Sequence, residues 1–162
     1  MTSKRKLMAA FASVFAAVAV AGGAIATAGA ASKAAGNTLA GTWTVTVNRP
    51  APLPPLTSLQ VYTGKGSMVE SANDSASRSP QYASWKRVDG REYAATGVFF
   101  RFDPQTGAFL GKQKINRTIE LSNDGQSFTF QAHVTIYDVN GNVLTSVSVG
   151  GSGQRLEVEA QS

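Results

Sequence analysis

Residues 123–141 read NDGQSFTFQAHVTIYDVNG, and this stretch decides the fold. Between residues 127 and 137, apolar side chains occupy every second position: Phe128, Phe130, Ala132, Val134 and Ile136. A period of two is typical of a β-strand with one buried face. The Asp-Gly pair at 124–125 and the Asn-Gly pair at 140–141 supply the positive φ angles that tight hairpin turns need. The stretch therefore predicts one strand with a hairpin at each end.

The same alternation and the same turn residues recur along the rest of the chain. They predict strands at residues 42–47, 56–63, 67–71, 81–88, 91–102, 109–121, 127–137, 143–149 and 154–159. The prolines between residues 50 and 55 end the first strand, and Gly150-Gly151-Ser152-Gly153 is expected to turn the chain into the last one. No segment of the domain has a convincing amphipathic helix pattern.

Eight or nine consecutive antiparallel strands would leave two exposed edges if the sheet stayed open. Soluble proteins usually avoid such edges by closing the sheet on itself. The predicted fold class is therefore all-β, an antiparallel up-and-down β-barrel of about eight strands, preferred over a two-sheet sandwich. We assign residues 39–160 to this domain.

The N-terminal segment has the three parts of a secretory signal peptide. A basic start at residues 1–6 precedes an apolar run at residues 7–21, and small residues at Ala26, Ala28 and Ala30 form cleavage sites. We expect residues 1–30 to be a cleaved signal, with cleavage near Ala28 or Ala30, and residues 31–38 to be a flexible lead-in. The alternative is an uncleaved anchor, but the apolar run is shorter than the roughly 20 residues that span a bilayer. The predicted localisation is secreted or periplasmic, with no stable membrane anchor after cleavage.

The composition argues against several classes of function. The net charge is +5, but three of the 15 basic residues belong to the signal, which leaves twelve against ten acidic residues and about +2. The remaining charges are scattered, whereas nucleic-acid binders concentrate basic residues on one face, so we expect no nucleic-acid partner. The absence of cysteine excludes a disulfide scaffold and a thiol nucleophile.

The sequence contains no catalytic or metal-binding motif. His133 is the only histidine, and its alternation places it on the outer face of its strand. No serine lies in a nucleophile elbow, and Asp103, Asp124 and Asp138 occupy turns, where such side chains cap backbone amides. We therefore predict no metal and no cofactor.

Arg117 is the anomaly in the inward-facing pattern. Alternation in residues 109–121 places Phe109, Ile115, Ile119 and Leu121 inside the barrel, together with Gly111, Gln113 and Arg117. In one interpretation, Arg117 and Gln113 form a polar patch in an apolar cavity and orient a ligand carboxylate or carbonyl. In the other, a β-bulge switches the face, or Arg117 lies at the rim and pairs with an acid such as Glu70.

Aromatic residues complete the candidate ligand-binding set. In residues 91–102 the predicted inward positions are Ala94, Thr96, Val98, Phe100 and Phe102. Tyr82, Trp85 and Tyr93 lie near a polar loop and would line a cavity mouth or, alternatively, pack in the core. The predicted ligand-binding residues are Arg117, Gln113, Glu70, Phe100, Phe102, Trp85 and Tyr82.

Gly41-Thr42-Trp43 at the start of the first strand resembles the Gly-x-Trp motif of lipocalins and the wider calycin group. The resemblance implies a secreted eight-stranded barrel that holds a small hydrophobic molecule. It also implies that the tryptophan closes the barrel floor against a basic residue near the end of the last strand, for which Arg155 is the match. The strand plan is equally similar to barrels of the allene-oxide-cyclase type, some of which are cyclases that steer their substrate by cavity shape.

Three hypotheses for the function follow. The first is an exported barrel that binds or carries a small hydrophobic molecule. The second is a cofactor-free cyclase or isomerase acting in the same cavity, with Arg117, Gln113 or Glu70 polarising the substrate. The third is a structural or inhibitory barrel, filled by its own side chains, that acts through its loops. The sequence leaves the oligomeric state open.

Overall fold

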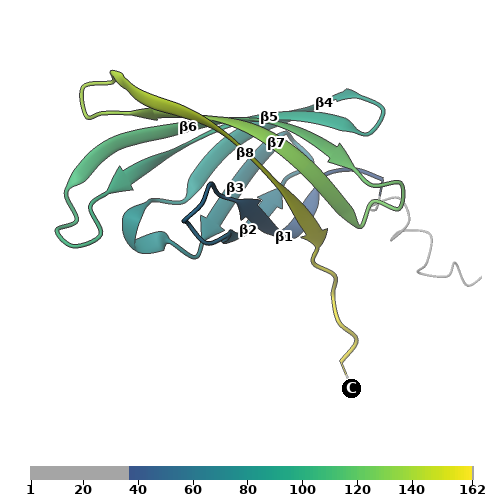
Figure 1. The fold of residues 1–162 in the computed structure, drawn as a ribbon. Helices are drawn as coiled ribbons and strands as arrows, with labels where there is room; N and C mark the ends of the chain where they lie inside the picture. The colour runs from purple at the N-terminus through teal and green to yellow at the C-terminus, as the bar shows by residue number, and fades with distance from the viewer. Residues whose placement is uncertain (1–36, 162) are drawn as a thin grey trace, which may run out of the picture.

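The computed structural model describes residues 37–161, which form a closed barrel of eight antiparallel strands (Figure 1). The strands are β1 (Gly41–Asn48), β2 (Leu56–Tyr62), β3 (Ser67–Ala72), β4 (Gln81–Asp89), β5 (Glu92–Phe102), β6 (Phe109–Leu121), β7 (Ser127–Tyr137) and β8 (Val143–Arg155). Each strand pairs with the next in sequence, and β8 pairs with β1 to close the sheet. The predicted all-β up-and-down barrel is confirmed.

The predicted signal peptide and most of the lead-in lie outside the described residues. Within residues 37–161, no helix has the length and apolar character that a membrane crossing would require.

The two ends of the barrel differ, and the loops between successive strands lie alternately at one end and at the other. The closed end is the one at which β1 begins and β8 ends. It carries the short turns at residues 63–66, 90–91 and 122–126. At the open end, the longer loops 49–55 and 73–80 lie beside loops 103–108 and 138–142, and a short 3-10 turn, η1 (Ser75–Ser77), is part of the second of these. We use these two names for the ends below.

The glycine-rich segment near the C-terminus lies within a strand, so the predicted turn at residues 150–153 is wrong. It forms the middle of β8 and pairs with β7 on one side and β1 on the other. Gly151 and Gly153 are needed there because aromatic rings from β7 lie over them. A Cβ on Gly151 would approach Phe130 Cε1 to 2.6 Å, and one on Gly153 would approach Phe128 Cε2 to 2.9 Å. Glycine in a strand often marks such a close approach, and the predicted ninth strand is absent from the part of the chain that the structure describes.

Replacing Gly151 with alanine is expected to destabilise the barrel by about 1–3 kcal/mol, because the added methyl group overpacks the site. The new Cβ would collide with the Thr46 carbonyl oxygen as well as with Phe130. Gly64→Ala is the matched control, since no atom lies within 4 Å of the Cβ it would add. Urea denaturation of both variants measures the difference, and equal stabilities would contradict the role given to Gly151.

The predicted inward faces are confirmed for β7 and for most of β6, but the prediction for β5 is wrong from Ala94 to Phe100 and holds only for Phe102, which lines the interior. The buried residues of β5 are Tyr93, Ala95, Gly97 and Phe99 rather than the alternate set. They pair across the strands with inward-facing positions of β6, such as Tyr93 with Ile119. Both alternating sets of β5 contain large apolar residues, so the period of two identified the strand without identifying its inner face.

A register shift where β5 meets β6 explains one further difference. Arg101 pairs with Gly111, but Phe102 pairs with Phe109, so one extra residue lies on β6. The predicted inward direction of Phe109 is therefore wrong, and its side chain is largely exposed. The Phe109 ring packs edge-on against Phe100, with ring centroids 5.8 Å apart. A β-bulge of this kind reorients the side chains beyond it.

Side chains fill the half of the interior next to the closed end. The largest fully buried ones are Trp43, Tyr62, Tyr93, Leu39, Met68, Ile119 and Leu121. Phe128 links them, because its ring lies 4.8 Å from Trp43 and 6.4 Å from Tyr62, in edge-to-face geometry. The core is therefore concentrated at one end of the barrel.

Candidate functional site

Trp43 and Arg155 close one end of the barrel, as the resemblance implied. They are paired in the register of β1 and β8, and the Arg155 guanidinium lies 4.2 Å above the indole ring. The indole nitrogen of Trp43 donates to the Leu39 carbonyl at 2.9 Å. Arg155 donates to the carbonyls of Ala40 and Thr38, at 2.9 Å and 2.7 Å, so it ties the lead-in across the barrel floor.

Steric contacts explain why position 41 of the Gly-Thr-Trp motif is a glycine. A side chain there would collide with the Arg155 guanidinium, and the backbone φ of 140° is one that other residues rarely adopt. The glycine therefore makes room for the arginine that covers Trp43.

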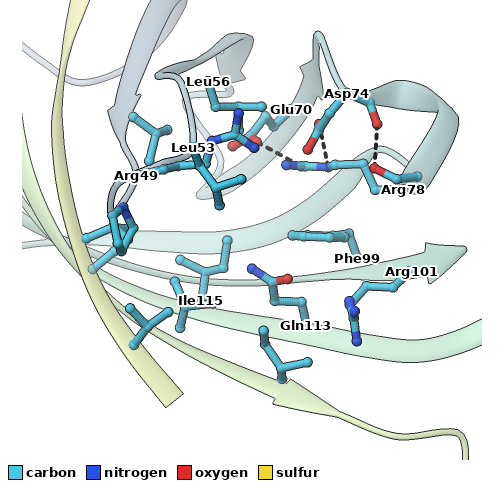
Figure 2. A pocket seen from close by; sticks show the side chains of 18 of the residues that line it. Arg49, Leu53, Leu56, Glu70, Asp74, Arg78, Phe99, Arg101, Gln113 and Ile115 are labelled. Atoms are coloured by element: carbon cyan, nitrogen blue, oxygen red, sulfur yellow. Dashed lines mark hydrogen bonds and ion pairs between the residues drawn. The ribbon is translucent and has the colours of Figure 1, made fainter. Parts of the chain in front are cut away.

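A pocket of about 410 Å³ occupies the other half of the interior and opens between the loops of the open end (Figure 2). Its apolar lining comprises Val47, Pro50, Leu53, Leu56, Phe99, Phe102, Pro104, Leu110, Ile115, Phe130, Ala132, Val134, Ile136, Val147 and Val149. Its polar lining comprises Arg49, Glu70, Asp74, Ser77, Arg78, Arg101, Gln113 and Arg117. Figure 2 shows Glu70, Asp74 and Arg78 on one side of the pocket, opposite Gln113 and Arg101. The pocket is thus an apolar chamber with charged groups on part of its wall.

Glu70 lies at the centre of a buried polar cluster. Its carboxylate accepts hydrogen bonds from Arg117 Nη2 at 2.7 Å, from Arg78 Nη2 at 2.8 Å and from Gln60 Nε2 at 2.8 Å. Burial by itself raises the pKa of Glu70, but the two arginines outweigh burial and hold that pKa below its usual range. Glu70 is therefore ionised, and the cluster is an Arg–Glu–Arg triad inside the barrel.

Further polar side chains connect the triad to the filled half of the core. Tyr62 donates its hydroxyl proton to Gln60 Oε1 at 2.8 Å, and burial raises the pKa of Tyr62 to about 12. Gln81 Oε1 accepts a second hydrogen bond from Arg117 Nη2 at 3.0 Å. Burial alone lowers the pKa of Arg117, but Glu70 more than compensates and raises it, so the guanidinium stays charged. Hydrogen bonds from Gln60 to Glu70 and from Arg117 to Gln81 therefore hold the cluster in place.

Arg117 still has unused donors. Its side chain is only 4% exposed, and its Nε and Nη1 atoms are buried without a hydrogen-bond partner among residues 37–161. The guanidinium carbon lies 5.7 Å from the centre of the Phe130 ring. Buried unsatisfied donors are uncommon and call for an explanation.

Four of the seven predicted ligand-binding residues line the pocket: Arg117, Gln113, Glu70 and Phe102. Arg117 combines features of the two interpretations, because it pairs with Glu70 yet lies inside the barrel rather than at the rim. No strand irregularity occurs at its position, where it pairs with Ala95 and Ala132.

The other three predicted residues lie elsewhere. The predicted inward direction of Phe100 is wrong, because its side chain is 52% exposed on the outer face of β5. Tyr82 is 65% exposed on β4 and does not reach the pocket. Trp85 packs against Tyr62 and Tyr93 of the filled core, with ring centroids 5.9 Å and 5.6 Å away.

Sequence reasoning missed Arg78, Gln60 and Gln81, all of which belong to the polar cluster. The alternation Ser58-x-Gln60-x-Tyr62 on the inner face of β2 was a usable signal, because it places polar groups where a core strand would have apolar ones. Arg78 had no such signal, since it lies in a polar loop. His133 lies on the outer face, and no cluster of three potential metal ligands occurs in the described part of the chain.

No protein-family model matches the chain. No curated protein matches it either. The fold is a closed antiparallel barrel of eight strands, which is consistent with a calycin-like barrel in general.

Proposed function

We propose that this protein is an exported barrel that binds or carries a small hydrophobic molecule in the open-end pocket. The proposal rests on how the interior of the barrel is divided. Buried side chains fill one half, and the other half contains a pocket of about 410 Å³ with mainly apolar walls. Ligand pockets in proteins typically measure roughly 300–1,000 Å³ and combine apolar walls with a few polar groups.

The tryptophan–arginine floor supports a lipocalin-like assignment over the allene-oxide-cyclase type. The floor closes the end of the barrel at which Trp43 and Arg155 meet, so a ligand would enter from the opposite end. Export through the predicted signal at residues 1–30 would place the protein in the periplasm or outside the cell.

The other two hypotheses receive less support. A barrel that acted only through its loops would need no internal space, whereas this one keeps a pocket. Isomerase chemistry usually needs a group that exchanges a proton, and the ionised Glu70 is a weak base because two arginines hold its carboxylate. We therefore favour binding over catalysis, with no cofactor involved.

Replacing Val149 with phenylalanine is expected to reduce binding of the neutral dye Nile red at least tenfold. Val149 lines the pocket and is only partly buried, so the larger ring would fill the space a ligand needs. Ser148→Phe is the matched control, because its side chain points outward from the same strand. Fluorescence titration gives the affinities, with circular dichroism to show that both variants fold. Equal Nile red binding by the two variants, or none by the unmodified protein, would overturn the proposed function.

A further inference from the structure

We propose that the ligand ends in a carboxylate, and that Arg117 binds this carboxylate at the bottom of the pocket. The inference rests on the proposed function and narrows it, since a hydrophobic ligand could equally carry a carbonyl, an alcohol or no polar group. Three observations on Arg117 and its surroundings support the choice.

The first observation is the set of unused donors on Arg117. A guanidinium has five N–H groups, and within residues 37–161 Arg117 donates hydrogen bonds to Glu70 and Gln81, both from Nη2. Nε and Nη1 therefore keep three buried N–H groups without an acceptor among the residues the structure describes. Such donors are costly to leave unpaired, so a ligand that supplied acceptor atoms would gain affinity. The ligand group that fits is an acceptor rather than a donor.

The second observation is the excess of positive charge, which distinguishes a carboxylate from a neutral carbonyl. Four arginines line the pocket: Arg49, Arg78, Arg101 and Arg117. Only two acids, Glu70 and Asp74, lie among them, and Glu70 already serves two arginines. Buried charges are stabilised by opposite charges and poorly by neutral groups. The two buried arginines, Arg78 and Arg117, share the buried Glu70, so a ligand carboxylate would balance the remaining positive charge.

The third observation is the space around the guanidinium. Arg117 pairs with Ala95 of β5 and Ala132 of β7, which have short side chains, and Arg117 and Ala132 both line the pocket. The pocket walls nearer the mouth carry large apolar residues, including Leu53, Phe102 and Ile136. A ligand therefore fits with its carboxylate inward at Arg117 and its apolar part toward the open end.

Gln81 is a positioning residue for Arg117. Its Oε1 holds Arg117 Nη2, while its amide nitrogen lies against Gly97, where any Cβ would collide with it. Gln81 does not line the pocket. Its contact holds Nη2 against the barrel wall, so Nε and Nη1 are the atoms of the guanidinium that remain for the ligand.

The test compares two probes of nearly equal size, decanoate and decanamide, by isothermal titration calorimetry at pH 7. The unmodified protein is expected to bind decanoate about 10- to 100-fold more tightly, the range for hydrogen bonds to a charged group. Arg117→Met should keep decanamide binding and lose the preference for decanoate to within about threefold. Arg91→Met, which removes the same charge from the outer surface, should keep the full preference.

Each outcome separates this inference from the proposed function. Equal affinities of the unmodified protein for both probes would overturn the carboxylate inference and leave a hydrophobic binding pocket. Failure of both probes to bind would overturn the proposed function as well. A preference for decanoate that survived in folded Arg117→Met would assign the carboxylate to another arginine and contradict the role of Arg117.

A second measurement uses only the unmodified protein, in case Arg117→Met fails to fold. Lowering the pH through the pKa of decanoic acid should weaken its binding, because the neutral acid no longer complements the guanidinium. Decanamide binding should stay constant over the same range. The groups facing Arg117 are Glu70, Gln81 and Tyr62, and Arg78 faces Glu70, so a change common to both probes would reflect these groups rather than the ligand. A decanoate affinity that did not fall relative to that of decanamide would overturn the inference.

Discussion

Replacing Glu70 with glutamine is expected to lower the free energy of unfolding by roughly 3–5 kcal/mol, the typical cost of breaking a buried ion pair by removing one partner. The Glu70 side chain is only 1% exposed and holds both Arg78 and Arg117. A glutamine would preserve the shape but leave two guanidinium groups in a low-dielectric interior without a countercharge. Urea denaturation at pH 7, followed by circular dichroism, measures the loss.

Glu120→Gln is the matched control for this substitution. The Glu120 side chain is 62% exposed, and its pair with Arg91 spans 3.5 Å at the surface. Exposed pairs contribute about 0–1 kcal/mol, so this variant should remain close to the unmodified protein. If the two variants lost similar amounts of stability, the central role of Glu70 would be refuted.

The pH dependence of stability gives the same substitution a second readout. The pKa of Glu70 is lower in the folded than in the unfolded protein, so folding favours the ionised form. Its contribution is fully present above the unfolded pKa of about 4.3 and is lost as the pH falls through the folded value. The unmodified protein should therefore lose more stability on acidification below about pH 4 than Glu70→Gln does.

Replacing Trp43 with alanine is expected to cost roughly 3–5 kcal/mol, the usual penalty for truncating a fully buried aromatic residue. Trp43 has no exposed surface, contacts the Phe128 ring, and donates to the Leu39 carbonyl. Its loss would also remove the ring beneath the Arg155 guanidinium. The same denaturation measurement applies, with tyrosine or circular dichroism signals in place of tryptophan fluorescence.

Tyr82→Ala provides the comparison for Trp43→Ala. It also truncates an aromatic residue of the barrel wall, but the Tyr82 side chain is 65% exposed on the outer face. Surface substitutions of this kind usually change stability by about 0.5 kcal/mol or less. A Trp43 variant no less stable than the Tyr82 variant would show that the floor contributes little to folding.

The strand plan was largely readable from the sequence because its signals are local. Asp-Gly and Asn-Gly pairs fix the hairpins, and the period of two fixes the strands between them. The turn predicted at residues 150–153 was wrong for a physical reason. A glycine that is needed because the Phe128 or Phe130 ring lies over it cannot be told from the sequence apart from a glycine that is needed in a turn. The inner face of β5 was undetermined because both of its faces carry large apolar residues.

The candidate site was predictable only where one residue broke a pattern. Arg117 stood out as a charge on an apolar face, and Glu70 was a candidate partner because ion pairing was the evident solution for that charge. Arg78 and Gln81 gave no comparable signal. Arg78 reaches Glu70 from the loop between β3 and β4, whereas Gln81 meets Arg117 only once the sheet has curled, since the two lie 36 residues apart in the chain. Contacts between strands that are not neighbours depend on how the sheet curls, which the local turn and alternation signals do not specify.

The tie between Arg155 and the lead-in has a consequence for how the protein can be attached to anything else. Because the barrel has eight up-and-down strands, the chain enters and leaves it at the same end, opposite the pocket, and Arg155 fastens that end by binding Thr38 and Ala40. A linkage made just before β1 or just after β8 therefore leaves the pocket mouth facing away from the point of attachment. Attachment at that end and ligand entry therefore use opposite ends of the barrel.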